Sequence, residues 1–275
     1  DLYLLRKPWE ERSDQFGEFA KTKMPFNSRW NWKQDEGWKD GNWHFSDKGG
    51  GPFGHVTHIF SRGAKIAYQY WLYYEYTQDK RWLRERAYPM LKGVAEFYRN
   101  FPHLKKEDDG KYHIRHVNDN ESVWDGHNTV EEIASMMGIL PVAMRAAEIL
   151  DVDIDLREQW NETLVNLSPL PLSSAHPELS GKPVTFVRSL LPVLKGPASR
   201  IPDPNTMPVW FFDLYTLESA NQEMMQIAQN TFDAYFPTGI NKDSPVYVLS
   251  KLPVTGAQLG RADATRYLIP NQIET

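Results

Sequence analysis

The sequence WLYYEYTQDKRWLRERAYPMLKGVAEF, residues 71–97, contains the end of one apolar-periodic segment, a short polar turn and most of a second periodic segment. Apolar residues recur at three- and four-residue steps from His55 to Thr77, which predicts a helix. Asp79 is a suitable N-cap for the second helix, and Pro89 should kink that helix or mark a fresh start. One face of the second helix carries Leu83, Ala87, Met90, Leu91, Val94, Phe97, Tyr98 and Phe101. Helices joined by so short a turn must lie antiparallel, as a hairpin.

A second helical hairpin is predicted downstream. Thr129-Val130-Glu131-Glu132 has the pattern of a capping box, and the helix that it opens runs to Leu150. A shorter helix follows from Asp155 to Leu167, and helix returns near residues 217–236 and 254–268. A small β-excursion is expected near residues 107–117. The predicted fold is therefore mainly α and built of helical hairpins.

Composition excludes several classes of function. The 275 residues have a formal net charge of −5, so no basic field exists to attract nucleic acid. There is no cysteine, which excludes a disulfide framework, a thiol nucleophile and a thiolate zinc site. No run of about 18 apolar residues stands out, and we expect no membrane span. The glycine run at residues 48–52 lacks the ending of a phosphate-binding loop, and no cofactor is expected.

A polar stretch, HVNDNESVWDGHN, occupies residues 116–128 between the two predicted hairpins. We expect it to be a loop that lines a sugar pocket. Glu121 is the candidate general acid, since Asn118 and Asn120 can orient its carboxyl group. Trp124 can stack on a sugar or form an apolar wall that raises the pKa of the acid. The ordinary alternative is a solvated loop glutamate or a local cap, and the sequence leaves it open.

Glycoside hydrolysis needs a second carboxyl group on the other side of the scissile bond. Asp119 and Asp125 are too close to Glu121 along one loop to span that bond. The catalytic base is therefore expected from another segment of the chain. The candidates lie in the Trp-rich N-terminal part and are Asp35, Glu36 and Asp40.

Other aromatic and imidazole side chains are expected to contact the sugar. These candidates are Trp38, Trp43, His55, His58, His116 and His127. A metal site is not expected, because cysteine is absent and no HExxH pattern occurs. The aromatic run at residues 68–76 should pack in the core, with a sugar-stacking platform as the alternative. Glu75, within that run, is expected to be a buried hydrogen-bond anchor, with an active-site carboxylate as the alternative.

The hairpin of residues 71–97 resembles one found in bacterial (α/α)6-barrel glycoside hydrolases. It is most similar to glycoside hydrolase family 95, whose members include α-L-fucosidases and α-L-galactosidases. Asn120-Glu121, followed by a helix that ends AAEIL at residues 146–150, is similar to that family's general-acid loop and next helix. The resemblance covers residues 52–167 well and 210–275 faintly. It implies that Glu121 is the general acid. The family's water-activating asparagines are not matched, because Asn27, Asn31 and Asn42 lie outside its pattern.

The resemblance implies hairpins that form all or part of an (α/α)6 toroid. Residues 55–275 would be a barrel catalytic region of a longer chain that also carries a β-sandwich domain, and residues 1–54 a Trp-rich irregular segment. The alternative is a variant with a reduced barrel. The proline-rich residues 168–209 would line the pocket. The expected function is hydrolysis of a glycosidic bond in an oligosaccharide or polysaccharide, in the periplasm or outside the cell. The alternatives are a non-catalytic glycan-binding helical protein and a polysaccharide lyase on a similar toroid.

Overall fold

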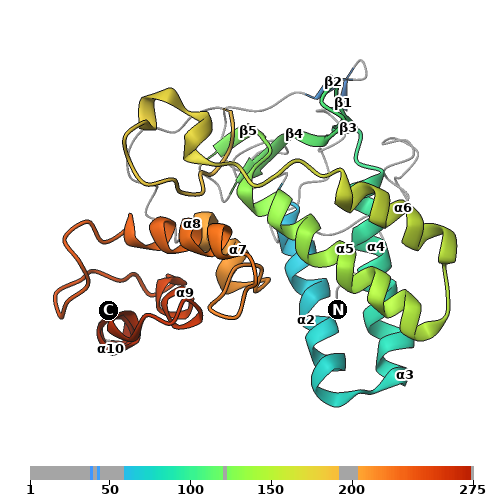
Figure 1. Cartoon of the computed structure of the whole chain (residues 1–275). Helices are drawn as coiled ribbons and strands as arrows, with labels where there is room; N and C mark the ends of the chain where they lie inside the picture. Colours follow the sequence, from blue (N-terminus) through green and yellow to red (C-terminus); the bar gives the residue numbers. More distant parts are fainter. Residues whose placement is uncertain (1–37, 40–41, 44–58, 120–122, 192–203, 274–275) are drawn as a thin grey trace.

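The computed structural model describes residues 38–39, 42–43, 59–119, 123–191 and 204–273, and Figure 1 shows their arrangement. Its main body is two helical hairpins. The first consists of α2 (Ser61–Thr77), the short α3 (Lys80–Trp82), the π-helical turn η3 (Leu83–Ala87) and α4 (Tyr88–Arg99). The second consists of α5 (Val130–Leu150) and α6 (Ile154–Val165). The prediction of a mainly α fold built of helical hairpins is confirmed.

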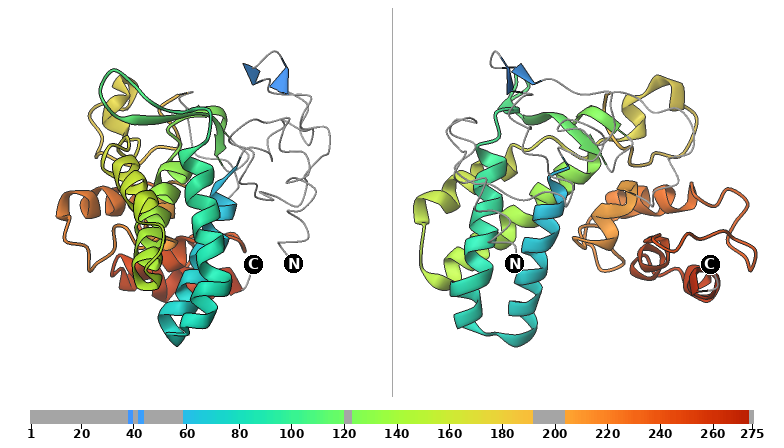
Figure 2. Two further views of the ribbon diagram at one scale, coloured as in Figure 1. Left: turned by 90° about the vertical axis from the view of Figure 1, so that its right-hand side faces the viewer. Right: turned by 180° about the vertical axis from the view of Figure 1, so that it is seen from behind.

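Asp79 and Pro89 determine how the first hairpin turns, which Figure 2 shows from behind. The Asp79 carboxylate accepts hydrogen bonds from the backbone N–H groups of Arg81 at 2.9 Å and Trp82 at 3.1 Å, as a predicted N-cap should. Pro89 has no N–H group, and its ring would clash with the carbonyl group one turn earlier. The wider turn η3 removes that clash, and Pro89 then lies in the first turn of α4. Of the two predicted alternatives, Pro89 therefore marks the start of a new α-helical segment and not a kink inside one.

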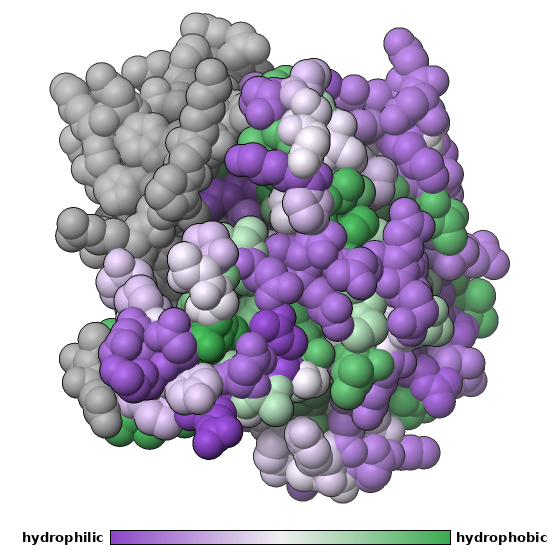
Figure 3. All heavy atoms as spheres, turned by 60° about the vertical axis from the view of Figure 1, so that its left-hand side comes forward, coloured by the Kyte–Doolittle hydropathy of each residue, from purple (hydrophilic) through white to green (hydrophobic). Residues whose placement is uncertain are grey.

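Helix α5 is the core helix, packed against α2, α4 and α6. It is apolar around most of its circumference, and its fully buried apolar residues include Val130, Ile133, Ala134, Met136, Ile139, Leu140, Ala143, Ala146 and Ala147. Its length and apolar composition would also suffice for a helix that crosses a membrane. However, 61% of its most apolar 18-residue stretch is buried inside the fold. Polar side chains prevail on the face drawn in Figure 3, with smaller apolar patches between them. We interpret α5 as the centre of a folded core.

Three antiparallel strands, β3 (Leu104–Lys106), β4 (Tyr112–Asp119) and β5 (Val123–His127), cross the upper end of the hairpins in Figure 1. The β-excursion predicted near residues 107–117 is therefore present and larger than expected. Residues 116–128 were expected to form a loop, and that expectation is wrong. Two strands take up most of the stretch, because Val117 pairs with Gly126 and Asp119 with Val123. The joint between them, residues 120–122, lies outside the described residues.

The aromatic run in α2 is only partly in the core. Trp71 and Tyr74 are 5% exposed, whereas Tyr73 is 50% and Tyr76 87% exposed. Only one face of α2 packs on α4 and α5, so side chains on the opposite face remain in solvent. Glu75 is one of these exposed residues, and the expectation that it is a buried anchor is wrong.

Residues 204–273 form a helical group beside the hairpins, made of η6 (Pro204–Thr206), α7 (Met207–Trp210), α8 (Gln222–Asp233), α9 (Leu252–Gln258) and α10 (Ala262–Ile273). The helix predicted near residues 254–268 is two helices, because Gly260 adopts φ +75° and ends the first. Before this group, the helical turns in residues 168–191 are the 3-10 turns η4 (Ser173–Ala175) and η5 (Pro177–Leu179), and the absence of longer helices there agrees with the prolines of this segment. The two short strands β1 (Trp38–Lys39) and β2 (Asn42–Trp43) pair with each other.

Gly138 allows the C-terminal group to dock on α5. A methyl group placed on Gly138 would lie 2.3 Å from Cδ1 of Phe212, a buried ring just after α7. Gly138→Ala should therefore lower the free energy of unfolding by about 1–3 kcal/mol, although alanine favours helix more than glycine does. Urea unfolding measures this change. Adding Phe212→Leu should recover part of the loss, and an unchanged or higher stability of Gly138→Ala alone would contradict this contact.

Candidate active site

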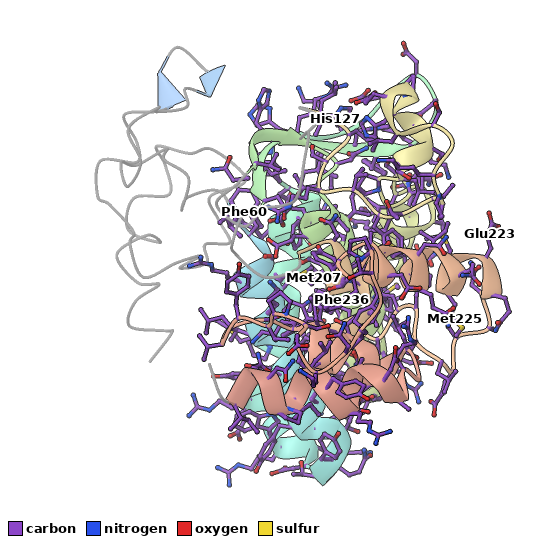
Figure 4. The ribbon with its side chains drawn as sticks, turned by 90° about the vertical axis from the view of Figure 1, so that its left-hand side faces the viewer. Phe60, His127, Met207, Glu223, Met225 and Phe236 are labelled. Carbon is purple, nitrogen blue, oxygen red and sulfur yellow. The ribbon has the colours of Figure 1, made fainter. Side chains whose placement is uncertain are left out.

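The end of the hairpins that meets the sheet contains five buried polar side chains, which we call the buried polar cluster. Tyr98 comes from α4, Asp119 ends β4, Glu131 and Glu132 begin α5, and Arg188 lies after the 3-10 turns. Each is at most 5% exposed. Figure 4 labels Phe60 and His127 at this end of the molecule. Charged side chains are rarely buried so fully, and a group of them marks a candidate site.

Glu132 joins three elements. Its Oε1 accepts hydrogen bonds from the backbone N–H groups of Phe60 at 2.8 Å and Ser61 at 3.1 Å. The Tyr98 hydroxyl donates to its Oε2 at 2.6 Å. The capping box predicted at residues 129–132 is therefore wrong, and the Thr129 side chain makes no cap hydrogen bond. Glu132 does not cap its own helix but caps the N-terminus of the neighbouring helix α2. The first turn of α2 has no acidic residue of its own.

Glu131 forms an ion pair with Lys65. Its carboxylate lies 3.2 Å from Nζ of Lys65 in α2, and the Ser61 hydroxyl donates to it at 3.4 Å. The same ammonium group lies 5.4 Å from the ring centroid of Trp210 and 5.9 Å from that of Phe211. Lys65 therefore connects α2, α5 and the C-terminal group through one cation.

Burial raises the pKa of two carboxyl groups in the cluster. Burial raises the pKa of Asp119 well above its ordinary value, and Glu131 raises it further, while Arg188 and Lys65 oppose the shift. Burial also raises the pKa of Glu132 to about 8, although Tyr98 and the amide hydrogen bonds pull the other way. Burial is the largest cause of both shifts, and the neighbouring Glu131 adds to both.

Several predicted site residues lie on the two strands. Asn118 is fully buried beside Asp119. His116 adopts φ +57°, and its ring lies edge-on to His103, with centroids 4.6 Å apart. His127 lies at the end of β5 instead, with Nε2 3.3 Å from Nδ1 of His113. Burial first, then Arg115 and His113, lower the pKa of His127, so its ring is uncharged at neutral pH.

Other predicted residues cannot be placed. Trp124 belongs to β5, and Trp38 pairs with Trp43 across the short β1–β2 hairpin, but their side chains are outside the described part of the chain. The remaining predicted residues also lie outside it: Asp35, Glu36, Asp40, His55, His58, Asn120 and Glu121. Their assignment stays a prediction.

The sequence did not predict the buried polar cluster. Glu131 and Glu132 matched a local capping pattern, which hid their long-range contacts. Lys65 is a cation between the apolar residues Ala64 and Ile66, and this pattern could have indicated a buried partner. Arg188 lies in the proline-rich segment that was expected to line a pocket, but its type and spacing gave no separate signal.

Two comparisons with known proteins bear on this site. The sequence profile described as the glycosyl hydrolase family 95 catalytic domain matches residues 41–179, half of the chain. That range includes both hairpins, the sheet and four residues of the buried polar cluster.

Two relatives carry the same name. The kojibiose hydrolase of Flavobacterium johnsoniae is 42% identical over 52 residues, which are 19% of this chain and 7% of that protein. The kojibiose hydrolase of Mucilaginibacter mallensis is 33% identical over 106 residues, which are 38% of this chain and 15% of that protein. The matched part therefore spans at most 15% of the length of these relatives.

Proposed function

The chain belongs to glycoside hydrolase family 95, and from this we propose that it contributes catalytic residues to an enzyme that hydrolyses a glycosidic bond. The observation that carries the proposal is the family match over residues 41–179, which includes the β4–β5 joint with Glu121. The buried polar cluster, whose Asp119 directly precedes that joint in sequence, supports it, because strongly perturbed carboxyl groups gather at catalytic sites. Neither a glycan-binding protein nor a lyase is favoured by this match.

In the proposed reaction, Glu121 protonates the glycosidic oxygen as the bond to the sugar breaks. A second carboxylate, Asp35 or Glu36, acts on water or on the anomeric carbon from the other side. Asp119 directly precedes the joint and is fully buried, so we assign it a supporting role. Sugar rings and hydroxyl groups would be held by Trp38, Trp43, His55, His58, His116, Asn118, Asn120, Trp124 and His127.

We propose a small glucoside such as kojibiose as the first substrate to test. Both matched relatives are named kojibiose hydrolases, whereas the resemblance of residues 71–97 is to a family that includes α-L-fucosidases. An L-fucoside is therefore the natural competitor. A pocket that hydrogen-bonds the hydroxyl groups of one sugar discriminates strongly against a sugar that lacks them.

The test is a product assay of the longest natural chain that contains these residues, with kojibiose, aryl α-L-fucosides and a panel of larger glycans. We expect release of a reducing sugar. Sugar that binds but stays intact over a long incubation would support the binding protein instead. An ultraviolet-absorbing unsaturated product would identify a lyase, and either result would reject the hydrolase.

Two further statements about the whole protein are proposals. We propose that the natural chain also carries a β-sandwich domain, as the family resemblance implies, and that it acts in the periplasm or outside the cell. Domain mapping by limited proteolysis tests the first, and fractionation of the producing cell tests the second.

A further inference from the structure

Two histidines on neighbouring strands approach each other closely. His113 lies in β4 and His127 ends β5, and Nδ1 of the first is 3.3 Å from Nε2 of the second. Metal–nitrogen bonds of about 2.0–2.1 Å at a tetrahedral angle place two nitrogen ligands about 3.3–3.4 Å apart. The separation of these two atoms is already that of two ligands of one ion.

The surroundings of His113 leave the lone pair of the neutral ring on Nδ1, the nitrogen that lies 3.3 Å from Nε2 of His127. The orientation of the Asn128 side chain follows from its Oδ1, which accepts from the Ile114 N–H at 2.9 Å. Its amide nitrogen therefore faces Nδ1 of His113 at 2.8 Å, so that nitrogen is unprotonated in the neutral ring. The proton is on Nε2, which donates to Asp109 at 3.0 Å. Histidines that bind metals usually donate their second N–H to a carboxylate in this way.

Glu107 supplies a third ligand. One carboxylate oxygen of Glu107 and one ring nitrogen of each histidine all lie within 4.8 Å of one another. Arg115 holds the same carboxylate through two hydrogen bonds of 2.8 and 2.9 Å, from Nε and Nη2. A carboxylate has about four acceptor positions, so it can keep Arg115 and turn one oxygen towards an ion.

The backbone around the two histidines is fixed. The N–H of His127 donates to the Leu191 carbonyl at 2.8 Å, and the N–H of Asn128 donates to the Ile114 carbonyl at 2.8 Å. The amide nitrogen of Asn128 also donates to the Ser168 hydroxyl at 2.8 Å, a contact that it can keep when an ion takes the His113 lone pair. Rigid surroundings lower the cost of ordering the ligands.

We propose that Glu107, His113 and His127 bind one divalent transition-metal ion, with zinc as the best match for two imidazoles and a carboxylate. A water molecule would complete a four-coordinate shell. The ion would join the β3–β4 turn to both β4 and β5. This departs from the expectation, drawn from the sequence, that the chain has no metal site. It gives His127 a role other than the sugar contact proposed above, and it does not depend on glycosidase activity.

The experiment titrates the full chain, stripped with a chelator, with Zn²⁺ against a chromophoric competitor, and repeats the titration with Co²⁺ in a visible spectrometer. We expect one equivalent of Zn²⁺ and the intense visible bands of four-coordinate Co²⁺. His113→Gln and His127→Gln should each abolish this equivalent. Asp109→Asn should weaken binding by about 10–100-fold, because it removes only the carboxylate behind His113.

His176→Gln is the matched control, because His176 is a buried histidine near η5 and outside the cluster. It should bind Zn²⁺ as the parent chain does, and circular dichroism verifies that every variant is folded. The proposal fails if no 1:1 binding is found in the folded parent. It fails equally if folded His113→Gln and His127→Gln keep the equivalent, or if Co²⁺ gives only the weak bands of an octahedral ion.

Discussion

Glu121→Gln is expected to lower kcat for an unactivated glycoside by about 10²–10⁴-fold, with the fold unchanged. Glutamine has nearly the shape of glutamate and can still accept hydrogen bonds, but it cannot deliver a proton to the departing oxygen. The ground-state contacts to the sugar would remain, so KM should change far less than kcat. The measurement is a pair of steady-state curves on the natural chain, for the parent and the variant.

The leaving group separates loss of proton delivery from a general disturbance of the pocket. A dinitrophenyl glycoside departs without protonation, so Glu121→Gln should hydrolyse it at a rate much closer to that of the parent. Glu75→Gln is the control, because Glu75 is an exposed carboxylate on the far side of α2 and should leave both rates unchanged. Equal losses on activated and unactivated substrates would remove Glu121 from the role of general acid.

The helices were predictable because their information is local. Apolar residues at three- and four-residue steps defined α2, α4 and α5, and Asp79 marked a helix start that the structure confirms. Pro89 predicted an interruption of the α-helix, because proline has no backbone N–H group and its ring clashes with the preceding turn. Such signals depend on the neighbours of a residue in sequence, and the sequence contains them all.

The sheet and the buried polar cluster were less predictable because they depend on distant contacts. Asn118 and Asp119 are poor strand formers, yet they extend β4 because β5 pairs with it. Glu132 fits a local capping pattern, but its partners are 72 and 71 residues earlier in the chain. His113 approaches His127 only when the two strands pair, and their spacing of 14 residues carries no metal signature.

Glu132→Ala is expected to lower the free energy of unfolding by about 3–5 kcal/mol. The substitution leaves two amide N–H groups at the start of α2 and the buried Tyr98 hydroxyl without their acceptor. Each buried polar group that loses its partner costs about 1–3 kcal/mol, and the cavity adds to that cost. Glu132→Gln should lose much less, because its carbonyl oxygen can still accept from Phe60 and Ser61.

The pH dependence of the same pair tests the protonation state of Glu132. Its pKa is raised from an ordinary 4.5 to about 8 in the folded chain, so between these values the folded state binds more protons than the unfolded state. Stability from this group is complete below pH 4.5 and is lost as the pH rises towards 8. The slope of the loss is at most about 1.4 kcal/mol per pH unit.

Glutamine cannot titrate, and so the difference in unfolding free energy between the parent chain and Glu132→Gln removes the titrations of groups that do not interact with Glu132. That difference should fall between pH 4.5 and 8 and become flat above 8, when both are measured by urea unfolding. A difference that rises with pH would mean that the three donors keep Glu132 ionised in spite of its burial. The cap on α2 would then be a buried negative charge.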